Sequence, residues 1–132
     1  MIDGGRSGLI DEVATFSSCT RTELDLLGTI GAPMAAAERT EITVENMPGR
    51  ECFVIKSGRA RVTRGGELVG HLAAGQYFGE MSLLTGAAHQ TTVTAETPME
   101  LIVLSPLEFN ALLENAPTVV RKMLRMRSRA VA

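Results

Sequence analysis

Apolar residues near the start of the chain recur at the three- and four-residue intervals typical of α-helices. Residues 8–16 place theirs at positions 9, 10, 13 and 16, which predicts a short helix after a flexible glycine-rich tail over residues 1–7. A second helix is predicted after Thr20 or Thr22, because a threonine before Glu23 is typical of a helix N-terminus. Its apolar face comprises Leu24, Leu27 and Ile30.

From Arg39 onward the spacing changes to the alternation of β-strands. Residues 41–46 alternate polar and apolar side chains, which predicts a half-buried strand. The Met-Pro-Gly sequence at residues 47–49 predicts a turn after it.

Three further strands are expected over residues 52–72. A compact β-branched and aromatic run over residues 52–56 predicts one strand, which ends at residues 57–58, Ser-Gly. Residues 59–63 and 68–72 are predicted to form a hairpin, because the glycine pair at residues 65–66 favours a tight turn between them.

The stretch over residues 75–93, GQYFGEMSLLTGAAHQTTV, interrupts this succession of strands. An aromatic pair, a glycine, a short apolar helical piece, a small-residue loop and a Thr/Val strand follow one another, which predicts a pocket in the side of a β structure. Gly79 permits close approach of the backbone to a ligand. The amides of Glu80, Met81 and Ser82 would lie at the start of the short helix and favour an anion there.

The last third of the chain returns to strands and then to helices. Residues 92–104 predict two strands joined by a turn at residues 96–98. Ser105 is expected to cap a helix with Pro106 at its first position. A further helix is predicted over residues 118–130, with the basic residues Arg121, Lys122, Arg125, Arg127 and Arg129.

Many short strands between terminal helices predict a mainly β fold. We expect an antiparallel β-roll or jelly-roll (double-stranded β-helix) with N-terminal helices and C-terminal helices. One domain is expected over residues 8–132, in which residues 116–132 form the terminal basic helix.

Composition narrows the classes of function. The chain has 132 residues, 45% apolar and 21% charged, which is ordinary for a soluble globular protein. A net charge of -2 gives no bulk attraction to nucleic acid or anionic membrane. Cys19 and Cys52 lack C-x-x-C spacing and are expected to be buried thiols, although a disulfide stays open. No stretch has the character of a signal peptide or membrane span, so we expect a cytoplasmic protein.

Two motifs resemble a known family. FGEMSLLTG followed by AAHQTTV is similar to the phosphate-binding cassette of cyclic nucleotide-binding domains, F-G-E-[LI]-A-L-L, a loop, then P-R-[AT]-A-[TS]-V. PGRECFVIKSGRARV resembles the family's first β segments, P-G-D-x-x-Y-V-[IV]-x-S-G-x-[VA]-x-V. The resemblance is to domains of the catabolite activator and protein kinase A regulatory subunit type, and it covers about residues 16–124.

This resemblance implies a regulatory, ligand-sensing domain that binds cyclic AMP or cyclic GMP and needs no cofactor. It implies that the ligand-binding residues are Phe78, Gly79, Glu80, Met81, Ser82, His89, Gln90 and Thr91. In the family the acidic residue at Glu80 accepts a hydrogen bond from the ribose 2′-hydroxyl, and polar groups near Gln90 and Thr91 help to select the base. From the residues alone, the alternative for Glu80 is that it caps a local turn or faces water, and polar residues at a strand edge are common.

His89 stands where the family has the arginine that holds the cyclic phosphate. A neutral histidine offers one donor instead of a charge-assisted pair, which should weaken phosphate binding by about one to two powers of ten. No Lys or Arg occurs between Arg64 and Arg121, so positive charge would have to come from Arg59, Arg61 or the last helix. An inert surface histidine is the other interpretation.

Two functions from different classes therefore remain open. One is a cyclic nucleotide sensor with an altered cassette, and the other is a degenerate module that acts as a scaffold or dimerisation domain. An enzyme is not expected, because the two histidines, His71 and His89, form no H-x-H metal motif and G-x-S-x-G is missing. With no DNA-binding domain and no membrane span expected in this chain, output would pass to a homodimer or a partner protein through the C-terminal helix.

Overall fold

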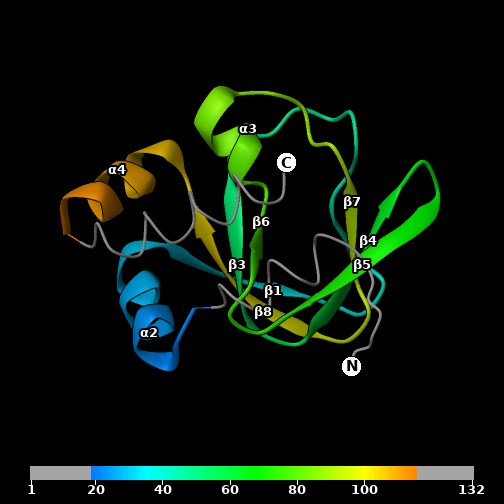
Figure 1. The fold of residues 1–132 in the computed structure, drawn as a ribbon. Coiled ribbons are helices and arrows are strands. Elements are labelled where there is room, and N and C mark those ends of the chain that lie inside the picture. The colour runs from blue at the N-terminus through cyan, green and yellow to red at the C-terminus, as the bar shows by residue number, and fades with distance from the viewer. Residues whose placement is uncertain (1–18, 116–132) are drawn as a thin grey trace.

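The computed structural model describes residues 19–115, shown as coloured ribbon in Figure 1. The tail over residues 1–7, the helix at 8–16 and the basic helix at 118–130 lie outside this part. In chain order the elements are α2 (Arg21–Ile30), β1 (Ala32–Ala36), β2 (Glu41–Thr43), β3 (Cys52–Ser57), β4 (Arg59–Arg64), β5 (Glu67–Ala73), β6 (Tyr77–Phe78), α3 (Glu80–Thr85), β7 (Thr92–Ala95), β8 (Met99–Leu104) and α4 (Pro106–Asn115).

The strands form two four-stranded sheets, ordered β1-β8-β3-β6 and β2-β7-β4-β5. All their pairings are antiparallel. Helices α2 and α4 lie together at one side of the molecule, and α3 lies at the end of β3 and β6 (Figure 1). The predicted mainly β fold, an antiparallel β-roll with flanking helices, is confirmed for the described residues. Among residues 19–115, no helix is both long and apolar enough to cross a membrane.

Strand β3 explains why residues 52–55 are apolar without alternation. Phe53 and Ile55 point into the core between the two sheets. Cys52 and Val54 point to the opposite face, where the helices cover the first sheet. Because both faces are buried, the strand needs apolar residues at successive positions.

Each long helix begins with a reciprocal cap that the sequence specifies locally. Thr20 Oγ1 accepts from the Glu23 amide at 3.1 Å, and Glu23 Oε1 accepts from the Thr20 amide at 2.8 Å. Ser105 and Glu108 repeat this arrangement at the start of α4, at 3.3 and 2.8 Å. Two orphan amides are satisfied at each helix start. The structure thus selects Thr20 as the cap of α2 and confirms Ser105 as that of α4.

The strand predicted at residues 41–46 was too long. It ends at Thr43, because a register shift between Glu41 and Thr43 turns the polar Thr43 inward and leaves Val44 exposed. The turn predicted at residues 47–49 also lies earlier, since the Met47 amide bonds to the Val44 carbonyl at 3.1 Å and Asn46 has a left-handed φ of 70°.

Strand β1 was not predicted. Its sequence, APMAA, lacks both alternation and β-branched residues. It forms because its backbone pairs with β8 at the edge of the first sheet. Pro33 is tolerated at such an edge, where a strand has a neighbour on one side.

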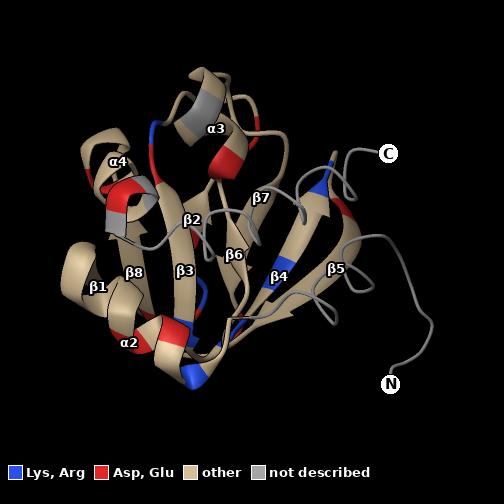
Figure 2. Cartoon of the chain, turned by 60° about the vertical axis from the view of Figure 1, so that its left-hand side comes forward, with Lys and Arg blue, Asp and Glu red and all other residues tan. Residues whose placement is uncertain are grey.

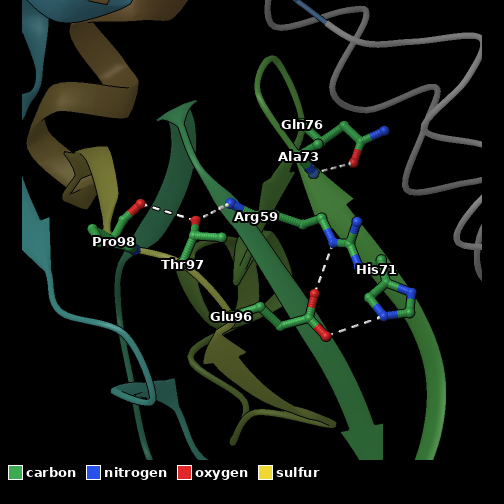
Figure 3. Close-up of polar contacts among 7 residues, drawn as sticks. All are labelled: Arg59, His71, Ala73, Gln76, Glu96, Thr97 and Pro98. Carbon is green, nitrogen blue, oxygen red and sulfur yellow. Dashed lines mark hydrogen bonds and ion pairs between the residues drawn. The ribbon is translucent and has the colours of Figure 1, made fainter.

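A carboxylate ties the second sheet to the turn between β7 and β8 (Figure 3). Glu96 Oε1 lies 2.7 Å from Arg59 Nε, and its Oε2 lies 3.3 Å from His71 Nε2. The next residue, Thr97, accepts from the Arg59 amide at 3.0 Å. Burial raises the pKa of Glu96, but the hydrogen bonds and charges of Arg59 and His71 outweigh it, so the pKa is lowered overall.

We expect Glu96→Gln to destabilise the fold by about 0.2–1 kcal/mol at pH 7. A lowered folded-state pKa means that the stabilisation is present above the unfolded-state pKa of about 4.3 and is lost as pH falls through the folded value. Urea unfolding at pH 7 and at pH 3 checks this. The exposed Glu100→Gln is the control. Equal stability of Glu96→Gln and wild type at pH 7 would contradict the prediction.

Candidate functional site

The candidate site begins where β6 ends, at Gly79. This residue has a left-handed φ of 86° and precedes α3. A Cβ at Gly79 would lie 2.7 Å from the carbonyl oxygen of Glu51, so a side chain is excluded by space as well as by conformation. The backbone of the cassette therefore lies directly against the segment that enters β3.

Ser82, in the middle of α3, holds the loop that follows the helix. It is 1% exposed, and its Oγ donates to the Ala87 carbonyl at 2.7 Å. The same Oγ lies 3.1 Å from Nδ1 of His89. Because the hydroxyl has a single proton and donates it to Ala87, it accepts from His89. The neutral imidazole therefore carries its hydrogen on Nδ1 and a lone pair on Nε2.

The other side of the His89 ring packs on Gly49. A Cβ built on Gly49 would lie 2.2 Å from Nε2 and 2.9 Å from Cε1, so the glycine leaves the space that the ring fills. The backbones are also joined, since Asn46 N donates to His89 O at 2.7 Å and His89 N donates to Met47 O at 3.0 Å. Partial burial lowers the pKa of His89. The imidazole is consequently neutral at pH 7.

Glu80 is the first residue of α3 and is half-buried. It lies close enough to Cys52 for its charge to act on the thiol. Burial first, and then the charges of Glu80 and Cys19, raise the pKa of Cys52. Both cysteines are buried free thiols, as the sequence predicted. Glu80 thus places a carboxylate where β3 and α3 meet.

The remaining predicted ligand residues divide between the core and the surface. Phe78 is buried between the sheets, where its ring stacks on Phe53 at a centroid distance of 5.2 Å. Met81 and Thr91 are half-buried, and Gln90 is exposed. The structure therefore brings Ser82 and His89 into direct contact. The roles of all eight residues in ligand binding stay predictions.

Arg50 is a residue of this region that sequence reasoning missed. A Cβ built on Gly86, the residue that ends α3, would lie 3.7 Å from Arg50 Nη1. The signal was present in the motif, because PGRECF has arginine where the family pattern P-G-D-x-x-Y has aspartate. Figures 1 and 2 both show the segment that leads into β3 passing beside α3.

The fold and this cassette define a class, the β-roll domains in which a short helix and a loop lie between two strands. Comparison with known proteins gives the same answer. The family model described as "Cyclic nucleotide-binding domain" matches residues 35–116, more than half of the chain. The chain belongs to the cyclic nucleotide-binding domain family.

Three similar proteins illustrate the family. The cAMP-dependent protein kinase regulatory subunit of Yarrowia lipolytica is 32% identical over 121 residues, 84% of this chain. This chain spans 32% of the length of that relative. A structure from the work "A cyclic-GMP-dependent signalling pathway regulates bacterial phytopathogenesis" has a TM-score of 0.78 at 26% identity, over 87% of this chain and 96% of that one. The Catabolite Activator Protein of Thermus thermophilus has a TM-score of 0.75 at 25% identity, over 85% of this chain and 55% of that one.

The contact between Gly49 and His89 leads to a test by double-mutant cycle. Gly49→Ala should destabilise the fold by about 1–3 kcal/mol, because the methyl group collides with the imidazole. In a His89→Ala background the same change should cost little, since the ring is gone. Urea unfolding of the four variants measures the coupling. Additive effects of the two substitutions would show that the ring does not occupy this space.

Proposed function

We propose that this domain is a regulatory sensor of cyclic AMP or cyclic GMP with an altered phosphate-binding cassette that binds its ligand weakly. The single observation that carries the proposal is the built form of the cassette. Gly79 and Gly86, both left-handed, frame α3, and the buried Ser82 hydroxyl holds the loop beyond it. Membership of the family supports the choice of ligand, as do relatives whose names refer to cyclic AMP or cyclic GMP.

The proposed division of labour follows the positions of the side chains. Glu80 would accept from the ribose, while His89 and the backbone after Gly79 would face the phosphate. Gln90 and Thr91 would lie toward the base. Ligand capture would then change the packing of the helix that starts after Ser105 and be passed to a partner. This is a regulatory role and not an enzymatic one.

The proposed weak binding of the nucleotide has a specific cause in His89. Its Nδ1 hydrogen is used by Ser82, so Nε2 of the neutral ring offers a lone pair and no donor. The Nε2 end of the ring also packs on Gly49, so the neutral imidazole offers a phosphate no hydrogen-bond donor. The ring would become a donor at Nε2 only when protonated, and its lowered pKa makes that protonation costly at neutral pH.

A ligand screen tests the proposal directly. We expect cyclic AMP or cyclic GMP to raise the melting temperature saturably, because a ligand that binds the native state stabilises it by mass action. Glu80→Ala should abolish the shift, whereas Glu114→Ala, an exposed substitution on α4, should keep it. If neither nucleotide raises the melting temperature at millimolar concentration, the sensor function is refuted.

One observation favours the alternative, a degenerate module kept as a scaffold or dimerisation domain. His89, at the family's arginine position, is engaged with Ser82 and Gly49 and is neutral. A failed screen together with self-association in analytical ultracentrifugation would support this alternative.

The sensor also predicts a pH dependence. A bound phosphate should raise the pKa of His89 above its lowered value in the free protein. Affinity is then greatest below the free-state pKa and falls as pH rises through the bound-state pKa. Calorimetry at pH 6 and pH 8 should give tighter binding at pH 6. His89→Arg, charged at both values, should bind more tightly at pH 8 and lose the difference. Equal wild-type affinities would remove His89 from the site.

A further inference from the structure

We propose that Arg50 supplies the fixed positive charge of this cassette and contacts the phosphate of the ligand. The inference rests on the proposed function, and it deepens it by placing the anion-binding charge outside the cassette motif, on the segment before β3. Arg50 would then be a ligand-binding residue in addition to the eight that the motif indicates.

The position of the guanidinium is the first support. Its Nη1 lies 3.7 Å from where a Cβ of Gly86 would be, so it packs against the turn that follows α3. That turn leads through Ala87 to His89, the region in which the family motif holds the phosphate. The charge is therefore next to the loop, although it is far from it in the sequence.

The backbone of Arg50 is held there by its neighbours on both sides. Gly49 packs beneath the His89 ring, and the Glu51 carbonyl lies against Gly79. Both ends of the cassette thus touch the residues that flank Arg50. The hydrogen bonds that join His89 to Asn46 and Met47 fix the same segment further upstream. These contacts fix the backbone at Arg50, and the exposed side chain extends from it beside the turn after α3.

The guanidinium is also available to an anion. Arg50 is exposed, and no carboxylate of residues 19–115 forms an ion pair with it. Arg59, by contrast, is engaged by Glu96 at 2.7 Å. An arginine offers paired donors in a planar fork that suits phosphate oxygens.

This chain differs from the family motifs at two positions, and in this geometry the two differences compensate each other in charge. The motif aspartate is replaced by Arg50, and the motif arginine is replaced by His89. These positions lie on two segments that are joined by backbone hydrogen bonds. In the family motifs the aspartate and the arginine at these two positions have a net charge of zero. In this chain Arg50 and a neutral His89 have a net charge of +1. The positive charge of the site is therefore kept, at Arg50 and not at position 89.

The test is calorimetric titration of Arg50→Gln with cyclic AMP and cyclic GMP at pH 8, where His89 is neutral. We expect Kd to rise by about 10- to 100-fold, the effect of losing charge-assisted hydrogen bonds. Arg64→Gln, which removes another exposed arginine, at the end of β4, should leave Kd within about twofold of wild type. Arg50→Lys, which keeps the charge without the fork, should lie between them. Urea unfolding of each variant confirms that it folds.

The outcomes separate this inference from the function on which it rests. If wild type binds and Arg50→Gln binds equally well, the role of Arg50 is overturned and the sensor stands. If Arg50→Gln and Arg64→Gln weaken binding equally, the effect is one of overall charge, and the role of Arg50 is again overturned. If wild type binds neither nucleotide, the sensor fails and the role of Arg50 fails with it.

Discussion

The burial of β3 on both faces is the constraint on which the candidate site depends. Val54 and Ile55 are fully buried on opposite faces, one toward the helices and one toward the second sheet. Strand β6 pairs with β3 through Phe53–Phe78 and Val54–Tyr77. That register brings Gly79 beneath the Glu51 carbonyl and so fixes the point at which α3 starts. The cassette is therefore attached to a strand that is buried on both faces, and its position follows from core packing.

At the other end of the cassette, the single proton of the Ser82 hydroxyl determines which nitrogen of His89 carries a hydrogen. The Ser82 hydroxyl gives its hydrogen to Ala87 and so requires one from His89. These two hydrogen bonds of Ser82 order the loop, but they also leave the neutral imidazole without a second donor. Holding the loop and binding an anion thus make opposite demands on His89 at neutral pH. A separate cation such as Arg50 relieves that conflict, because it lets His89 keep its structural role.

Local signals made much of the fold predictable from the sequence. The caps at Thr20 and Ser105 lie within one helical turn of their partners, and the glycine pair at residues 65–66 closes the predicted hairpin between β4 and β5. Strand β1 escaped prediction because its backbone pairing with β8 supplies what its own residues lack. Thr43 and Val44 were misplaced because a register shift exchanges their faces.

The site was predictable in its motif and not in its contacts. FGEMSLLTG identified the cassette, yet the packing of Gly49 on His89 and of Arg50 beside Gly86 joins segments that are far apart in the chain. No spacing rule connects such segments, since their approach depends on how β2, β3 and β7 are arranged. The same distance explains why the stretch without Lys or Arg after Arg64 suggested a cassette with no cation nearby.

The core also shows how an event at the cassette would reach the helices. Leu83 of α3 lies in the same hydrophobic cluster as Leu27 of α2 and Leu112 of α4. The cluster between the sheets is separate and contains no residue of these helices. A close-packed core transmits displacement, because its side chains have few voids to move into. A shift of α3 would therefore be felt by α2 and α4, whose side chains share this cluster with Leu83.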